Sequence, residues 1–327
     1  MPYNQFTSDE RDRLQQMIAI ETPVFEIAMM LNKHRTSIVR EILRNSGPGG
    51  YSSGKAQKKA QERRLDSKTS PKKENRALMN YVGAKIRLKH SPVQVSGRLR
   101  LEYPDDPAWQ VSSETIYTWI YAQIRAGADL KGCLRQGNKI RRKRLSGKDK
   151  RGTIRNRVSI DERPIAVGAK QQAGHWEGDT VEGAGKQGYL ATYVERKTKY
   201  LIAFPLPTKQ ADPLARATVK AFRKVPDEML KTITYDNGLE FARHQEISIT
   251  LGSKIYFAHP YHSWERGLNE HTNGLLRQFF PKGQSLANLT NSQLAKAVRM
   301  LNNRPRKILN FQTPAEAYAK ELCALQI

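Results

Sequence analysis

The second half of the chain alternates between short segments of β-strand character and longer helical ones, and this pattern constrains the fold more than any other feature. Strands are predicted at residues 176–181, 190–196, 200–206, 232–235 and 254–258. Helices are predicted at residues 213–224, 241–251 and about 264–280. A meander of strands followed by alternating helix and strand is typical of an α/β layer fold with a mixed sheet.

Three carboxylates, Asp179, Asp236 and Glu270, lie in segments where such a fold forms a cleft. Asp179 lies near the end of the first predicted strand, and Asp236 directly follows the fourth. Because strand ends in α/β folds open into a shared cleft, we expect Asp179 and Asp236 to meet there. Glu270 lies on the last predicted helix, with 33 residues between it and Asp236.

The helix that carries Glu270 has two stripes of side chains. The apolar stripe consists of Leu268, Leu275, Leu276 and Phe279. The polar stripe consists of Arg266, Glu270, Asn273 and Arg277. Glu270 could therefore face the cleft beside cations that hold phosphates, and Arg266, Asn273 and Arg277 are predicted to contact DNA. A solvated glutamate–arginine face explains the same stripe. Spacing only modestly favours the three carboxylates over four neighbouring acids, which are Glu177, Glu182, Glu240 and Glu265.

The chain is strongly basic, and its positive charge is concentrated in the first half. It has 56 Lys and Arg residues against 31 Asp and Glu residues, a net charge of +25 and a pI near 10.1. Residues 1–157 hold 33 of the basic and 15 of the acidic residues. A charge of this size favours a polyanionic partner, and nucleic acid is the usual one. The first half therefore predicts DNA affinity, while the three carboxylates all belong to the second.

The remaining composition indicates a cytoplasmic, reduced protein. The mean hydropathy is −0.68, and no apolar run approaches the roughly 18 residues of a membrane span. The first residues lack the character of a signal peptide. Cys133 and Cys323 provide neither a disulfide framework nor a cysteine-based zinc site.

Clustered carboxylates in a cationic protein indicate a metal ion between protein and phosphate. Mg²⁺ prefers oxygen ligands, and two ions about 4 Å apart can activate an attacking oxygen and stabilise a leaving one. Mn²⁺ is expected to substitute for it. The sequence has no evident Ser–His–Asp or Cys–His arrangement, which fits water or a 3′-hydroxyl as the nucleophile. Five histidines lack a cysteine at zinc-ligand spacing and are interpreted as structural or DNA-facing: His175, His244, His259, His262 and His271.

Residues 7–45 contain three short amphipathic segments, as in a helix-turn-helix domain. Thr36 or Ser37 is expected to cap the third helix, with Ile38, Ile42 and Leu43 facing inward. The predicted groove and phosphate contacts are Arg35, Thr36, Ser37, Arg40 and Arg44. An ordinary helical hairpin with solvated arginines is the alternative, since the turn lacks a central glycine.

Five successive segments are predicted along the chain. They are a helix-turn-helix domain at 1–46, a basic linker or mobile basic helix at 47–77, a second helix-turn-helix domain at 78–138, a second basic linker at 139–165 and a catalytic domain at 166–327. The second module is expected to offer Ser113, Thr115 and Tyr117 to DNA. The second linker is expected to follow DNA through Arg141, Arg142, Lys143 and Arg144, and a nuclear-localisation signal is the alternative.

Six segments together resemble the DDE transposases of bacterial insertion sequences, specifically the insertion sequence thirty family. These segments are residues 157–164, 175–181, 236–241, 269–283, 301–306 and 313–316. The resemblance covers nearly the whole chain. It implies a multidomain protein in which all-α helix-turn-helix N-terminal domains precede an α/β RNase H-like catalytic domain of the retroviral-integrase type. It also implies that Asp179, Asp236 and Glu270 form the metal-binding triad.

The resemblance further implies a transposase that binds the terminal inverted repeats of its element, cleaves the DNA ends and performs strand transfer. Members of the family are thought to move through a circular intermediate. Holding two double-stranded ends together implies a homodimer or larger assembly on DNA. No membrane partner is expected, and the protein is expected to associate with the bacterial nucleoid. His175 and His271 depart from the residues expected in many relatives. The alternatives are a DNA-binding regulator with an inactive catalytic half and a simple RNase H-type nuclease.

Overall fold

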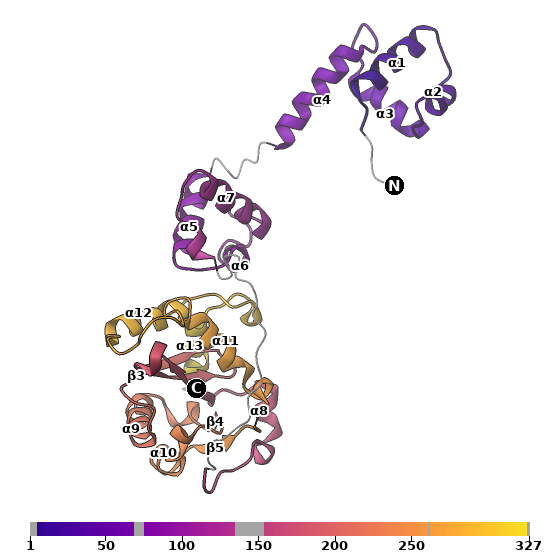
Figure 1. The fold of residues 1–327 in the computed structure, drawn as a ribbon. Coiled ribbons are helices and arrows are strands. Elements are labelled where there is room, and N and C mark those ends of the chain that lie inside the picture. The colour runs from indigo at the N-terminus through magenta and orange to yellow at the C-terminus, as the bar shows by residue number, and fades with distance from the viewer. Residues whose placement is uncertain (1–4, 69–74, 135–153, 261, 326–327) are drawn as a thin grey trace. The chain divides into compact units, whose positions relative to one another are not determined.

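The computed structural model describes residues 5–68, 75–134, 154–260 and 262–325 of the chain (Figure 1). The chain divides into two compact units, Met1–Arg76 and Ala77–Ile327. Among the helices described, none is both long enough and apolar enough to cross a membrane.

The first unit is helical. It contains α1 (Ser8–Ala19), α2 (Val24–Met30), α3 (Arg35–Asn45) and α4 (Ser53–Lys68). Leu14, Ile27 and Ile38 form its buried centre, one from each of the first three helices. The buried Arg11 of α1 contacts α3 through Glu41 at 2.7 Å and α4 through Gln57 at 2.7 Å. The predicted three-helix pattern is confirmed, and α4 adds a fourth helix within the predicted linker 47–77.

Two predicted details of α3 are wrong. The cap is His34, whose side chain accepts a hydrogen bond from the backbone of Thr36, so the helix begins one residue before Thr36. With the helix in this phase, Ile38 is buried and Ile42 is partly buried one turn later. Leu43 points away from that face and is 77% exposed.

The helical part of the second unit comprises α5 (Arg76–Arg87), α6 (Pro92–Glu102) and α7 (Ser113–Arg125). Ser91 caps α6, and its hydroxyl and Gln94 exchange hydrogen bonds with the opposite backbone groups. The buried Leu78, Leu99 and Ile116 pack together, one from each helix.

The sheet of the second unit has five strands in the order β3-β2-β1-β4-β5. Their bounds are β1 (His175–Glu182), β2 (Tyr189–Glu195), β3 (Leu201–Leu206), β4 (Thr232–Tyr235) and β5 (Lys254–Phe257). The first three strands pair antiparallel, whereas β4 is parallel to both β1 and β5. The predicted mixed sheet is therefore confirmed.

Helices cover both faces of this sheet (Figure 1). On β2, Ala191 and Tyr193 pack against one core and Leu190 and Val194 against the other, as the two-residue period of a strand requires. The first core includes α9 (Ala211–Phe222) and α10 (His244–Leu251), and the second includes α11 (Gly267–Leu276) and α12 (Asn291–Asn302).

The remaining described elements are short or terminal. They are α8 (Ile165–Ala169), α13 (Pro314–Ala324) and the 3₁₀ turns Lys131–Cys133, Ile160–Glu162, Ala184–Lys186, Asp227–Met229, Leu239–Phe241, Ser263–Arg266 and Lys307–Leu309. The predicted long helix at 264–280 is thus a 3₁₀ turn followed by the ten-residue α11.

Part of the predicted second linker packs on the five-stranded sheet. Ile154 is buried in the first core, and the carbonyl of Val158 accepts a hydrogen bond from the backbone N–H of Phe257 at 2.9 Å. The carbonyl of Asn156 lies 3.2 Å from the imidazole Nε2 of His244. The described residues from 154 onward therefore belong structurally with the sheet.

Candidate active site

The strand register brings Asp179 and Asp236 to the same level of the sheet. The parallel pairing of β1 with β4 ends at Glu177 opposite Thr234, and each aspartate lies two residues further along its chain. Asp236 directly follows β4, as predicted. Asp179 lies inside β1 and not near its end, because β1 continues beyond its pairing with β4. In this stretch β1 still pairs with β2, and Asp179 lies opposite Thr192.

A glycine and a tyrosine allow the two strands to pack closely just before these aspartates. Gly178 precedes Asp179, and Tyr235 precedes Asp236. A Cβ atom at position 178 would overlap the ring of Tyr235. Tyr235 is fully buried, so the absence of a side chain at Gly178 makes room for the ring that anchors the end of β4.

One guanidinium group joins the two aspartates. Arg266 Nη2 lies 3.2 Å from Asp179 Oδ1, and Nη1 lies 3.2 Å from Asp236 Oδ2. Arg266 Nη2 also donates a hydrogen bond of 2.8 Å to the carbonyl of Gly178. The arginine side chain is 10% exposed, so it lies beneath the carboxylates. Its predicted contact with DNA remains a prediction.

The electrostatics of this group favour a cation between the aspartates. Burial raises the pKa of Asp179, Arg266 opposes that rise, and the nearby Asp236 adds to it. Burial lowers the pKa of Arg266, but the two aspartates outweigh it and hold this pKa above its ordinary value. Two carboxylates drawn together in a partly buried position repel each other, and positive charge relieves that repulsion.

Hydrogen bonds fix the orientation of both aspartates. Asn273 Nδ2 donates to Asp179 Oδ2 at 2.8 Å, and the backbone N–H of Thr180 donates to Oδ1 at 2.9 Å. The amide of Asn273 is itself oriented by Thr192, whose hydroxyl donates to its Oδ1 at 3.0 Å. Asp236 Oδ1 accepts from the backbone N–H of Gly238 at 3.0 Å.

Most of the predicted polar stripe of α11 lies against β1. Arg266 and Asn273 contact Gly178 and Asp179, and Arg277 Nη2 donates to the carbonyl of Glu182 at 2.6 Å. The interpretation of this stripe as a solvated face is therefore wrong for Arg266, Asn273 and Arg277. Glu270 is exposed on the same stripe, one turn after Arg266 and one turn before Asn273.

The competing acids make other contacts. Glu177 is buried, pairs with Arg196 at 2.6 Å and accepts from the backbone N–H of Asn269 at 3.1 Å. Glu240 is also buried and accepts from the hydroxyl of Thr180 at 2.8 Å. Glu182 is exposed, and Glu265 contacts two histidines. Glu177 is thus a structural residue.

The predicted DNA contacts of the helical modules lie on outer surfaces where the structure describes them. Arg35, Thr36, Arg40 and Arg44 are exposed on α3, and Ser37 is half-buried. Ser113, Thr115 and Tyr117 are half-buried on α7. The four basic linker residues Arg141, Arg142, Lys143 and Arg144 lie outside the described residues. All of these contacts remain predictions.

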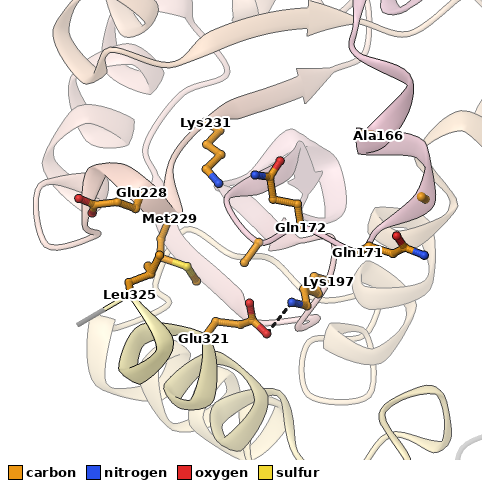
Figure 2. Close-up of a pocket in the computed structure, with 11 residues that line it drawn as sticks. Ala166, Gln171, Gln172, Lys197, Glu228, Met229, Lys231, Glu321 and Leu325 are labelled. Carbon is orange, nitrogen blue, oxygen red and sulfur yellow. Dashed lines mark ion pairs between the residues drawn. The ribbon is translucent and has the colours of Figure 1, made fainter. Parts of the chain in front are cut away.

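A pocket of about 490 Å³ lies apart from the aspartates (Figure 2). Lys197 and Glu321 form an ion pair of 2.7 Å in its wall, and Lys231 and Glu228 also line it. Asp179, Asp236 and Glu270 are absent from its lining. This pocket is therefore separate from the candidate active site.

Comparison with known proteins defines the class and then the family. The model of the integrase core domain matches residues 169–263, which span β1 to β5 and include Asp179 and Asp236. With the mixed sheet and its convergent carboxylates, this match defines a phosphoryl-transfer enzyme of the DDE type. Enzymes of this class depend on divalent metal ions.

Three relatives identify the family. The transposase for insertion sequence element IS4351 of Bacteroides fragilis is 40% identical over 314 residues, covering 95% of this chain and 94% of the relative. The transposase InsI for element IS30A of Escherichia coli strain K12 is 37% identical over 315 residues, covering 95% and 82%. The transposase for element IS1086 of Cupriavidus metallidurans is 36% identical over 324 residues, covering 98% and 96%. The chain belongs to the IS30 family of insertion-sequence transposases.

The described contacts also give two predicted site residues, Arg266 and Asn273, contacts that the sequence pattern did not predict. Arg266 was predicted on the polar stripe beside Glu270, and the structure shows that it joins the two aspartates. Asn273 orients Asp179, and its predicted contact with DNA remains a prediction. Both flank Glu270 at one-turn spacing, and this spacing was the signal available in the sequence.

Proposed function

We propose that this transposase recognises the terminal inverted repeats of its element and uses Asp179, Asp236 and Glu270 with Mg²⁺ to cleave the element ends and transfer them to target DNA. The observation that carries this proposal is the single guanidinium of Arg266, which lies within ion-pair distance of both aspartates. The guanidinium shows that the fold brings the carboxylates of Asp179 and Asp236 close to one another, which supports their acting together as ligands of a divalent ion.

The residues at this position fit Mg²⁺. The carboxylates of Asp179, Asp236 and Glu270 supply hard oxygen ligands, which this ion prefers over nitrogen or sulfur. We propose two Mg²⁺ ions, with Mn²⁺ as a substitute. When bound, these ions supply Lewis-acid activation of the attacking oxygen and stabilisation of the leaving oxygen.

The chain's own residues hold the carboxylates in place for this reaction. Asn273 and the backbone of Thr180 restrict Asp179, and the backbone of Gly238 restricts Asp236. Because these donors are already aligned, little reorganisation is required when the DNA enters. Water attacks the first phosphodiester, and the released 3′-hydroxyl attacks the second.

Arg277 supports a phosphate contact beside the triad. One of its terminal nitrogens, Nη2, donates to the carbonyl of Glu182 at 2.6 Å. The other, Nη1, is buried without a hydrogen-bond partner among the described residues. A guanidinium anchored on one side with a donor left over suits a phosphate oxygen.

We assign end recognition to the N-terminal modules. Arg40 and Arg44 are exposed on α3, the recognition helix of the first module. Ser113, Thr115 and Tyr117 of α7 are the corresponding candidates in the second module. The concentration of basic residues in 1–157 supports this division of labour. Two element ends require at least a homodimer, and we propose assembly on DNA.

The proposed domain arrangement keeps the helix-turn-helix domains at 1–46 and 78–138 and the catalytic domain at 166–327. The packing of Ile154 and Val158 on the sheet supports extending the catalytic body to the described residues from 154. The linker at 47–77 contains the helix α4.

Incubating the full chain with labelled element-end DNA and Mg²⁺ tests the proposal. We expect specific end cleavage and joined products with the wild type and neither with Asp236→Asn. Asp227→Asn is the matched control, because Asp227 is an exposed aspartate of the same unit. Tight DNA binding without cleavage in either Mg²⁺ or Mn²⁺ would overturn the proposal in favour of an inactive regulator.

A further inference from the structure

Three side chains converge at the turn between β5 and α11, outside the aspartate pair. His259, His262 and Glu265 follow one another at intervals of three residues. Glu265 Oε1 lies 2.9 Å from the imidazole Nδ1 of His259 and 3.2 Å from that of His262. The potential ligand atoms of the three residues all lie within 4.8 Å of one another. Each imidazole ring therefore directs its own Nδ1 atom toward Oε1 of Glu265.

A fourth residue orients one of these rings from outside the group. The Nε2 atom of His259 lies 2.9 Å from Asp161 Oδ2. Asp161 is held in turn by the hydroxyl of Ser159, which donates to the same Oδ2 at 2.8 Å. A carboxylate on the far nitrogen of a histidine is the usual support of a metal-bound imidazole, because it fixes the tautomer and raises the basicity of the ligating nitrogen. The arrangement thus has three potential ligands and a further carboxylate, that of Asp161, which supports one of them from outside.

We propose that His259, His262 and Glu265 bind a transition-metal ion of the zinc class at a second site, distinct from the catalytic carboxylates. Two imidazole nitrogens and one carboxylate oxygen suit Zn²⁺, which accepts such mixed ligands, and disfavour Mg²⁺, which takes oxygen. The earlier interpretation of these histidines as structural or DNA-facing is replaced for this pair. A cysteine is not needed, since Glu265 supplies the third ligand.

The site has a structural consequence for the active centre. Glu265 lies in the 3₁₀ turn Ser263–Arg266, and the next residue, Arg266, joins Asp179 and Asp236. A metal ion on His259, His262 and Glu265 would tie this turn to the end of β5. It would therefore fix the start of α11, the helix on which Glu270 is exposed.

A zinc titration tests the proposal. The full-length protein is first stripped of bound metals, then saturated with Mg²⁺, and then titrated with Zn²⁺. Mg²⁺ occupies carboxylate sites and leaves the histidine site free for Zn²⁺, or for Co²⁺ as a spectroscopic probe. We expect one Zn²⁺ per chain and a Co²⁺ absorption spectrum with nitrogen-ligand character. His262→Ala and Glu265→Gln should each weaken binding more than 10-fold, and Asp161→Asn about 10-fold through the outer support.

Two variants separate this site from other histidines and from the aspartates. His271→Ala removes an exposed histidine of α11 outside the group and should bind Zn²⁺ as the wild type does. Asp236→Asn should also retain Zn²⁺ binding. The proposal is overturned if the wild type binds no zinc under these conditions, if His262→Ala binds it equally well, or if Asp236→Asn abolishes it. Circular dichroism of each variant confirms that a loss is not unfolding.

Discussion

Nη2 of Arg266 lies 3.2 Å from Oδ1 of Asp179, so a buried arginine from the start of α11 neutralises an aspartate in the middle of β1. The other terminal nitrogen of Arg266 reaches Asp236 at the same distance. The arginine therefore connects three elements that meet only through the tertiary fold. On the proposed function, metal ions bind the same two carboxylates that Arg266 contacts, and this relationship has measurable consequences.

Arg266→Gln should destabilise the metal-free protein more than the Mg²⁺-saturated one. Without the guanidinium, Asp179 and Asp236 are left as repelling neighbours, and we expect a loss of about 2 kcal/mol, below the roughly 3–5 kcal/mol of a fully buried pair. Saturating Mg²⁺ should reduce that loss to below about 1 kcal/mol, because it restores positive charge. Denaturant unfolding with and without Mg²⁺ measures the difference.

Arg243→Gln is the matched control for that experiment. Arg243 pairs with Asp212 at 2.6 Å, but both side chains are more than half exposed. Solvent screens an exposed ion pair strongly, so the variant should be nearly neutral in stability and insensitive to Mg²⁺. An equal loss for Arg266→Gln in both conditions would argue against a shared role of arginine and metal.

Asn273→Ala should slow catalysis without weakening DNA binding. Its amide donates a hydrogen bond that orients Asp179, so we expect kcat to fall about 10–100-fold with the KM for end DNA unchanged. Single-turnover cleavage together with a binding titration separates the two effects. Asn288→Ala, at an exposed position of the same unit, should leave both unchanged. A rise in KM with unchanged kcat would instead support the DNA-contact role predicted from sequence.

The sequence predicted the strands from the local alternation of their side chains, and it predicted the meeting of Asp179 with Asp236 because strand ends of an α/β fold open into a shared cleft. It placed Asp179 wrongly near a strand end, since the extra length of β1 depends on its antiparallel partner β2. That dependence on a partner strand is not visible in the segment itself.

Long-range contacts explain the other differences. Asp161 meets His259 across 98 positions of sequence, and no local pattern indicates that pairing. Val158 lies in a stretch whose basic composition predicted a linker, yet its carbonyl pairs with β5. The cap of α3 is His34, a residue type that sequence rules rank below the adjacent Thr36 and Ser37. Composition and periodicity describe single segments of the chain, whereas contacts such as Asp161 with His259 and Val158 with β5 depend on two segments that meet in the fold.

Acid should destabilise the protein partly through His175. Burial, with the cations of Lys231 and Arg196, lowers the pKa of His175 from its ordinary 6.5 to about 4. Between these values the unfolded chain binds a proton that the folded chain does not, so the free energy of unfolding falls as the pH falls through this window. The contribution reaches about 3 kcal/mol near pH 4, at about 1.4 kcal/mol per pKa unit.

The variant His175→Gln should lose that component. Its free energy of unfolding, measured by denaturant titration from pH 7 to pH 4, should fall less steeply than that of the wild type. His271→Gln removes an exposed histidine and should follow the wild-type curve. Parallel curves for His175→Gln and the wild type would mean that this imidazole does not resist protonation.

Arg40→Ala and Arg44→Ala should weaken binding to the element ends and reduce its salt dependence. If each arginine contacts a phosphate, the slope of log affinity against log salt should decrease by about 1 per residue. Arg13→Ala, at an exposed position of α1, is the control of equal charge change. Equal effects of all three substitutions would indicate a diffuse electrostatic contribution and not a recognition helix.

The central claim is that Glu270 completes a catalytic triad with Asp179 and Asp236, and end cleavage by Glu270→Gln in Mg²⁺ tests it most directly. The account predicts that this variant binds end DNA normally and cleaves it at least about 10³-fold more slowly, as expected for loss of a metal ligand, while Glu246→Gln on the exposed side of α10 cleaves normally. The claim would be contradicted if Glu270→Gln cleaved end DNA at the wild-type rate while Glu240→Gln or Glu265→Gln lost cleavage.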